Sequence, residues 1–443
     1  MDEQRILANV TNLTAEQLFD SIKKGIVTLD KLMATGFLDA NKRKKIAELQ
    51  IQLDTNDDAA WERARYGNES TLRDYITSFP SGRHVQEAKD NIQALEIARG
   101  QARAEKERIL NRLKRNYNSY DPSQIFDYLQ NNTITKEELQ DCGIPGYIID
   151  NINNIHPIPL QLGQTPRSIP DGYTEVYFWG IPGSGKTCAL GSILNSAERQ
   201  GLLKFAIGPG YNYMTMLKNI FFDKNPILPP PSPVETTQYL PFTLRKTTEK
   251  NARSVSLIEL SGEIFQCFFY KHAGGQFPSQ SHKETFDTLI HFLSGNNRKI
   301  HFFFIDYAKD NVVDSENKTQ SDYLAAASLF FEKPEYKIFG KTTDAIYLIL
   351  TKSDLMPCSK EERFLEAKKH LNQHFPSFIN SLKKQCELYG INGGKLLYEP
   401  FSLGKVYFQQ ICDFDNSTAI NILDILMERI PSSKKSLLDI FNK

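Results

Sequence analysis

The sequence lacks the features that mark secreted, membrane-spanning and strongly charged proteins. Its six cysteines have no paired spacing, which excludes a disulfide framework and favours a reducing compartment. Basic and acidic residues balance at 53 each, so no global charge attracts nucleic acid or an anionic membrane. No apolar run approaches membrane-spanning length, and the charged start Met1-Asp-Glu-Gln-Arg is no signal peptide. We therefore expect a cytoplasmic protein without a membrane span or a nucleic-acid partner.

Two local patterns argue against a metal site and against a nucleic-acid-binding surface. Four histidines between 272 and 301 recur at intervals near ten, a spacing that matches no metal-ligand motif. The basic helix predicted over 98–115 is interrupted by Glu105 and Glu107 and carries no interleaved aromatic residues, which indicates a solvated face. The 443 residues, 40% of them hydrophobic, suffice for the core of one large domain and a second unit.

A phosphate-binding loop is the strongest motif in the chain. Residues 180–187, Gly-Ile-Pro-Gly-Ser-Gly-Lys-Thr, fit the pattern G-x-x-x-x-G-K-[ST] between a predicted strand (175–179) and a predicted helix (from 188). The glycines let successive N–H groups face phosphate oxygens, and the helix N-terminus adds partial positive charge. Lys186 would neutralise the outer phosphates, and the Thr187 hydroxyl would ligate Mg²⁺. The predicted nucleotide contacts here are Gly180, Pro182, Gly183, Ser184, Gly185, Lys186, Thr187 and Cys188.

A second motif separates GTP from ATP. A hydrophobic strand predicted over 345–350 runs directly into Thr351-Lys352-Ser353-Asp354, at the strand end where α/β sheets place ligands. The Asp354 carboxylate can accept two hydrogen bonds from guanine, whereas adenine would leave it unpaired. The Lys352 stem would lie across the purine face, and Thr351 belongs to the same contact set. Outside a nucleotide site, the same four residues would be an ordinary polar turn.

In this order, the motifs resemble the TRAFAC-type P-loop GTPases, in particular the bacterial double-GTPase group. The resemblance implies that a hairpin follows the first helix and that its second strand, here 254–258, ends in a γ-phosphate sensor. Gly262 would then bind the γ-phosphate, and Glu259 would hold Mg²⁺ through water, although the family usually has aspartate at that position. Glu263 would position the attacking water. A solvated loop carboxylate is the alternative for Glu263.

Two weaker assignments follow from the same resemblance. Residues 396–404 are similar to the family's last strand and loop, which would bring Ser402 to the base. A plain strand and turn is equally compatible with that segment. Among the threonines before the sensor, Thr237 is favoured as a switch I ligand of Mg²⁺, because it lies between a flexible segment and a predicted strand.

An ATPase remains an alternative. The hydrophobic run 302–305 ends in Asp306, as a Walker B strand does, and Asp306 would then hold Mg²⁺. Tyr307 follows where many ATPases carry a catalytic glutamate, which weakens this interpretation. A third possibility is an adaptor that nucleotide stabilises without turnover.

The N-terminal part is predicted to be helical and internally duplicated. Segments 18–32 and 125–139 share Phe-Asp, a polar turn and a threonine that caps a short helix ending at glycine. Between them, residues from Trp61 to Ala88 resemble one tetratricopeptide-like hairpin, which cannot form a solenoid alone and must pack against neighbours or a partner. A proline-rich stretch follows as a linker.

We thus expect an α/β P-loop domain with a mostly parallel sheet, preceded by an all-α region that binds an unknown protein partner. The predicted divisions are a first small module (1–50), a hairpin with a basic helix (51–115), a second module (116–156), a linker (157–173) and the GTPase domain (174–443). The expected cofactors are GTP or GDP and Mg²⁺, and the expected activity is a slow GTPase switch. The resemblance associates such fusions with bacterial conflict or defence systems, and the oligomeric state, an oligomer included, stays open.

Overall fold

The structure is a computed structural model that describes residues 2–152, 168–205, 207–208, 210–229, 237–272, 274–314 and 317–432. The chain divides into two compact units, Met1–Asn111 and Arg112–Lys443. Most of the predicted linker 157–173 lies outside the described residues. No helix in the described ranges combines the length and the apolar character needed to cross a bilayer.

The first unit is built from helices. They are α1 (Glu3–Ala8), α2 (Ala15–Lys23), α3 (Leu29–Ala34), α4 (Ala40–Ala64), α5 (Glu69–Ser78) and most of α6 (Val85–Arg115). One small core gathers around Leu18 and Leu32, and another gathers around Trp61 and Tyr75. Helix α4 runs without a break across residue 50, where the sequence suggested a module boundary, because no glycine or proline interrupts residues 40–64.

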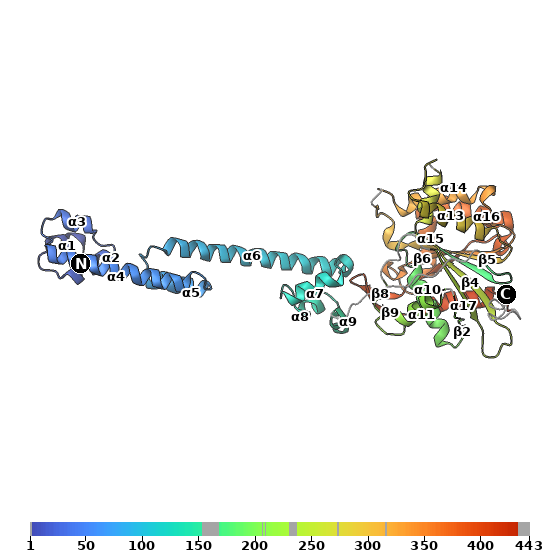
Figure 1. Ribbon diagram of the computed structural model, residues 1–443, viewed down its shortest axis with the longest axis horizontal. Helices are drawn as coiled ribbons and strands as arrows, with labels where there is room; N and C mark the ends of the chain where they lie inside the picture. Colours follow the sequence, from blue (N-terminus) through green and yellow to red (C-terminus); the bar gives the residue numbers. More distant parts are fainter. Residues whose placement is uncertain are drawn as a thin grey trace. The chain divides into compact units, whose positions relative to one another are not determined.

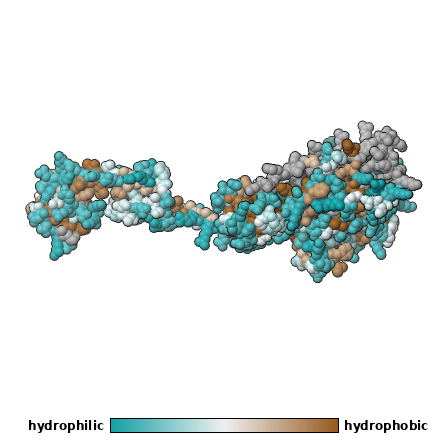
Figure 2. Space-filling view, turned by 90° about the horizontal axis from the view of Figure 1, so that it is seen from below, coloured by the Kyte–Doolittle hydropathy of each residue, from teal (hydrophilic) through white to brown (hydrophobic). Residues whose placement is uncertain are grey.

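The surface of this unit carries both hydrophilic and apolar residues. Figure 2 shows hydrophilic residues over most of the helices, with small groups of apolar residues between them. One shallow apolar hollow is lined by Ile22, Leu29 and Ile51.

The second unit opens with four short helical segments, η1 (Tyr117–Ser119), α7 (Pro122–Gln130), α8 (Lys136–Asp141) and α9 (Gly146–Asn151). The capping box predicted for α8 is present, since Thr135 accepts from the Glu138 N–H and Glu138 accepts from the Thr135 N–H. In the earlier segment, the Thr28 side chain accepts from the Lys31 N–H at the start of α3, as predicted.

A seven-stranded sheet forms the centre of this unit, in the order β2-β3-β4-β1-β5-β6-β7. Strands β4, β1, β5, β6 and β7 are parallel, whereas β3 runs antiparallel between β2 and β4. The strands are β1 (Thr174–Trp179), β2 (Leu203–Lys204), β3 (Gln238–Leu244), β4 (Arg253–Glu259), β5 (Arg298–Asp306), β6 (Thr343–Thr351) and β7 (Leu397–Pro400). The predicted mostly parallel α/β sheet is therefore confirmed. A separate hairpin pairs β8 (Gly404–Tyr407) with β9 (Ile411–Phe414).

Helices cover both faces of the sheet (Figure 1). One face packs against α10 (Lys186–Arg199), α11 (Tyr211–Ile220) and α17 (Ser417–Arg429). The other packs against α12 (Ile264–His272), α13 (Gln280–Leu293), α14 (Gln320–Phe331), α15 (Arg363–His374) and α16 (Pro376–Tyr389). Because both faces are buried, β1, β5 and β6 carry hydrophobic runs without regular alternation.

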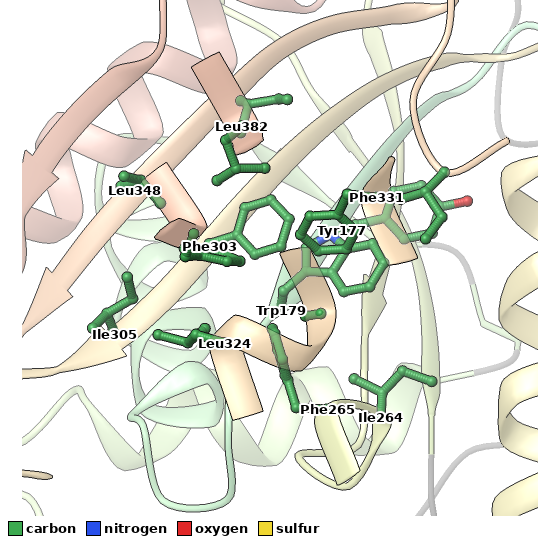
Figure 3. Close-up of a cluster of buried hydrophobic side chains, with 14 of the residues drawn as sticks. Tyr177, Trp179, Ile264, Phe265, Phe303, Ile305, Leu324, Phe331, Leu348 and Leu382 are labelled. Atoms are coloured by element: carbon green, nitrogen blue, oxygen red, sulfur yellow. The ribbon is translucent and has the colours of Figure 1, made fainter. Parts of the chain in front are cut away.

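The second face has an aromatic core. Trp179 of β1, Phe303 of β5 and Phe331 of α14 meet there (Figure 3), with ring centroids 5.3 Å apart for Trp179 and Phe303 and 5.6 Å apart for Phe303 and Phe331. His301 is buried in this core and accepts from the Trp179 indole N–H at 3.0 Å. Burial lowers the pKa of His301 to about 3, so it is a neutral core residue.

Candidate nucleotide-binding site

The candidate residues gather where the parallel strands end. Strands β1, β4, β5 and β6 end at Trp179, Glu259, Asp306 and Thr351, and parallel pairing brings these ends to one edge of the sheet. This carboxyl edge is the usual ligand-binding edge of open α/β sheets. The phosphate loop (180–187) follows β1, the predicted γ-phosphate sensor segment (259–263) lies at the end of β4, and Thr351–Asp354 lies at the end of β6. The fold therefore brings together three motifs that are far apart in the sequence.

The phosphate loop wraps around the ammonium of Lys186. Gly183 and Gly185 have φ values of 72° and 90°, in the left-handed region that glycine tolerates best. The Lys186 Nζ donates to the carbonyl oxygens of Gly180 at 2.7 Å and Ile181 at 3.1 Å. Burial lowers the pKa of Lys186 to about 8, although the charge of Glu259 opposes that change. The loop thus presents a desolvated cation beside the N-terminus of α10, an arrangement suited to anions.

Thr187 and Glu259 meet behind this loop. The Thr187 hydroxyl donates to Glu259 Oε1, and the Tyr213 hydroxyl donates to Oε2 at 2.7 Å. Burial raises the pKa of Glu259, and the two hydroxyl donors and Lys186 offset part of that rise. A hydroxyl and a carboxylate in contact are oxygen donors of the kind that Mg²⁺ prefers, so the pair fits the expected ion. Cys188 follows Thr187, and burial raises the pKa of its thiol to about 12, which keeps it neutral.

The sensor segment touches the phosphate loop. A Cβ added to Gly262 would lie 2.3 Å from the Pro182 nitrogen and 2.6 Å from the Pro182 Cα, so this backbone approach requires glycine. Lys309, just beyond β5, donates from Nζ to the Pro182 carbonyl oxygen at 2.6 Å. A second lysine therefore stands at the loop beside Lys186.

Glu263 and Thr237 lie near the phosphate loop and Glu259, and their surroundings differ. The Glu263 Oε2 pairs with His282 Nε2 at 3.0 Å, and the His282 Nδ1 contacts the Ser279 hydroxyl at 2.7 Å. Glu263 is thus held by α13 in this conformation. Thr237 immediately precedes β3, whose first residue Gln238 pairs with Glu259, which puts Thr237 at the same sheet edge as Glu259.

Asp354 and Ser402 form the second half of the site. The Ser402 hydroxyl donates to Asp354 Oδ1 at 2.6 Å, and the Gly404 N–H donates to that hydroxyl oxygen at 3.0 Å. Asp354 and Ser402 line one pocket with Thr418 and Lys405. The sequence predicted that these two residues share a ligand, and the structure brings them into direct contact.

Thr351 and Lys352 link this pocket to the phosphate loop. The Thr351 hydroxyl donates to the Ile305 carbonyl oxygen at 3.2 Å, and its methyl group lies within van der Waals distance of a Cβ added to Gly185. Lys352 has a φ of 56°, which is strained for a residue other than glycine. Its Nζ contacts Asp306 Oδ2 at 2.7 Å.

Both oxygens of the Asp306 carboxylate are engaged. Oδ1 accepts from the Ala308 N–H at 2.9 Å, and Oδ2 pairs with Lys352. A metal ion at Asp306 would have to displace that ammonium group, whereas Glu259 already contacts the hydroxyl of the phosphate loop. The geometry therefore favours Glu259 over Asp306 as the residue nearest a metal ion.

A residue of η1, one of the helical segments near the start of the second unit, lines the same pocket as Asp354. Tyr117 of η1 is part of the pocket wall, and its ring centroid lies 4.9 Å from that of Tyr407 on β8. The Lys405 Nζ lies 4.9 Å from the centre of the Tyr117 ring. The Gln409 backbone N–H donates to Asn118 Oδ1 at 2.8 Å, and the Gln409 side-chain amide donates to the Asn118 carbonyl oxygen at 2.9 Å. Burial raises the pKa of Tyr117 to about 12, and Tyr407 and Asp354 add to that rise.

Four residues near the site were not predicted from the sequence: Lys309, Tyr213, His282 and Tyr117. Lys309 could have been found, because it follows the strand end at Asp306 by three positions. The other three carry no local motif and reach the site only through tertiary packing.

Comparisons with known proteins give little more. No protein-family model and no curated protein matches the chain. Among solved structures, the Ski7 GTPase-like domain of S. cerevisiae bound to GDP and inorganic phosphate shares 13% identity at a TM-score of 0.27, over 52% of this chain and 43% of that one. Its GTP-bound form gives 14% and 0.28, over 58% and 51%. Roco2 RocCORdC of Methanosarcina barkeri, bound to GDP, gives 12% and 0.27, over 63% and 57%. This chain spans about half the length of these structures, and so low a likeness decides nothing about function.

The contact between Gly262 and Pro182 yields a stability prediction. Gly262→Ala would force two backbone segments apart, and we expect a loss of about 1–3 kcal/mol in the free energy of unfolding. Gly100→Ala is the control, since Gly100 lies inside α6 with nothing within 4 Å of an added Cβ; it should be neutral or stabilise by up to about 1 kcal/mol. Urea titration of both variants measures this difference. Equal stabilities would mean that the sensor segment does not approach the loop.

Proposed function

We propose that this chain is a GTP-binding switch that hydrolyses GTP slowly. The observation that carries the proposal is the pairing of Asp354 with Ser402 in a pocket at the sheet edge that also holds the phosphate loop. A carboxylate oriented by a hydroxyl can accept from guanine N1–H and the N2 amine together, and adenine offers no such pair.

The arrangement of the phosphate end supports a nucleoside triphosphate. Lys186 and the N–H groups of the loop would bind the phosphates, and Gly262 would offer its N–H to the γ-phosphate. Mg²⁺ would be held by Thr187 and, through water, by Glu259, with Thr237 as the proposed switch I ligand; the ion would neutralise charge on the phosphates. Glu263 would orient the attacking water once it is released from His282.

The strand order supports the resemblance to TRAFAC-type P-loop GTPases. The antiparallel pair β3–β4 follows α10, and Glu259 ends the second of these strands, as the resemblance implies. The double-GTPase group, a place in bacterial defence and a protein partner for the N-terminal helices stay proposals.

Nucleotide titrations and turnover measurements test this function. With Mg²⁺ present, we expect GTP to bind about 10³–10⁴-fold more tightly than ATP, with turnover on the order of 10⁻⁴–10⁻² s⁻¹. Glu263→Gln should lower turnover and leave GTP affinity within about twofold. A preference for ATP would favour the ATPase with Asp306, and tight GTP binding without any turnover would favour the adaptor.

The position of Tyr117 supports communication between the nucleotide and the second helical module. We propose that the Tyr117 ring contacts the bound nucleoside, so that GTP holds residues 117–151 against the β8–β9 hairpin. The segment after β7 carries both Ser402 and this hairpin, which gives the two sites a short physical connection.

Replacing Tyr117 tests this coupling. Tyr117→Ala should weaken GTP binding about tenfold, since one aromatic contact with a base contributes about 1–3 kcal/mol. GTP should also slow amide exchange over residues 117–151 in the wild type and not in this variant. The control is Tyr66→Ala, which removes an exposed tyrosine ring of the first unit and should leave both GTP affinity and exchange over residues 117–151 as in the wild type. Wild-type affinity and wild-type exchange in Tyr117→Ala would contradict the proposal.

A further inference from the structure

A second cluster of ligand-type side chains lies outside the residues assigned to the nucleotide. Asp310 directly follows the turn η3 (Tyr307–Lys309) at the end of β5, and His370 and His374 lie one turn apart on α15. One ligand atom from each residue lies within 4.8 Å of the other two. We propose that Asp310, His370 and His374 bind a divalent transition-metal ion of the Zn²⁺ type.

The distances fit three ligands that share one ion. The Asp310 Oδ2 lies 2.9 Å from His370 Nε2 and 3.2 Å from His374 Nδ1. Two ligand atoms at about 2.0–2.1 Å from a tetrahedral Zn²⁺ are themselves about 3.3 Å apart. The two imidazole ligand atoms lie within 4.8 Å of each other, so binding would require side-chain movements on the order of 1 Å.

The contacts within this cluster are short, yet two of its polar atoms lack a well-formed hydrogen bond. The His370 Nε2 is buried and makes no hydrogen bond of acceptable geometry, despite its short distance to the carboxylate. The Asp310 Oδ1 is also buried and lacks a hydrogen-bond partner. A buried carboxylate oxygen without a hydrogen-bond partner is costly, as is a buried imidazole nitrogen whose contact to a carboxylate is poorly aligned, and coordination of a cation would satisfy both.

The surroundings favour a cation and restrict its ligands. His370 and His374 are four residues apart, so they share one face of α15, and their rings stack with centroids 4.1 Å apart. His374 is the last residue of α15, where the helix dipole favours positive charge. Two imidazoles and one carboxylate suit Zn²⁺ and its neighbours in the first transition row better than Mg²⁺ or Ca²⁺. Water would fill the remaining coordination position.

The site has an accessible side and a structural role. The side chains of Asp310 and His370 are 12% and 14% exposed, whereas that of His374 is 45% exposed, which gives the ion a route of entry. A bound ion would tie α15 to the end of β5. Lys309, the neighbour of Asp310, contacts the phosphate loop through the Pro182 carbonyl. This inference does not depend on which nucleotide the loop binds.

Metal titration of the full chain tests the site. The protein is stripped with a chelator, kept reduced, and titrated with Zn²⁺ and with Co²⁺ in excess Mg²⁺, which occupies oxygen-donor sites. We expect one equivalent of either ion, a Co²⁺ absorption spectrum free of thiolate charge-transfer bands, and a rise in thermal midpoint on binding. His374→Ala and Asp310→Asn should each weaken binding at least about 100-fold and abolish the thermal shift.

Two controls keep the result interpretable. His272→Ala removes another exposed histidine of the same unit and should bind metal as the wild type does. His374→Gln serves if His374→Ala does not fold, because it keeps the bulk of the side chain. The proposal is overturned if the wild type binds no ion, if the Co²⁺ spectrum shows thiolate ligands, or if the variants of Asp310 and His374 bind as tightly as the wild type.

Discussion

The desolvated ammonium of Lys186 is the feature on which the nucleotide end of the structure depends. A buried cation is costly unless dipoles or counter-charges face it, and the phosphate loop supplies the carbonyl oxygens of Gly180 and Ile181. Glu259 adds a nearby negative charge and in turn holds the Thr187 hydroxyl. These contacts together fix the conformation of the loop around the lysine.

Several candidate functional groups lie at one edge of the sheet. Parallel strands bring their carboxyl ends together, so the phosphate loop, Glu259, the pocket of Asp354 and Ser402, and the Asp310 cluster share one sheet edge although they follow different strands. Rigid strands support them, whereas short loops carry the functional side chains. Through Tyr117, the pocket of Asp354 and Ser402 also borders the helical segments that open the second unit.

What the sequence could predict was set by how local each signal is. The phosphate loop and the Thr351–Asp354 turn are contiguous motifs, and hydrophobic runs located the strands around them. The contact between Asp354 and Ser402 could be anticipated only through a family resemblance. Tyr117, His282 and the Asp310 cluster reach their positions through contacts between residues that are distant in the chain. The other histidines, with a spacing near ten, matched no ligand motif, and the i, i+4 pair on α15 was not predicted to bind a metal ion. Helix α4 showed that a boundary inferred from duplication need not break a helix that has no glycine or proline.

If Asp354 binds a guanine base, exchanging its hydrogen-bonding character should change which base the pocket prefers. In Asp354→Asn, the amide oxygen can still accept from guanine N1–H, but the amide N–H would face the guanine N2 amine, whereas xanthine offers an oxygen acceptor in place of that amine. The measurement is the affinity of wild type and Asp354→Asn for GTP and XTP in the presence of Mg²⁺. We expect the variant to lose affinity for GTP and to gain affinity for XTP. An unchanged preference for GTP, or equal affinities for both nucleotides in the wild type, would contradict it.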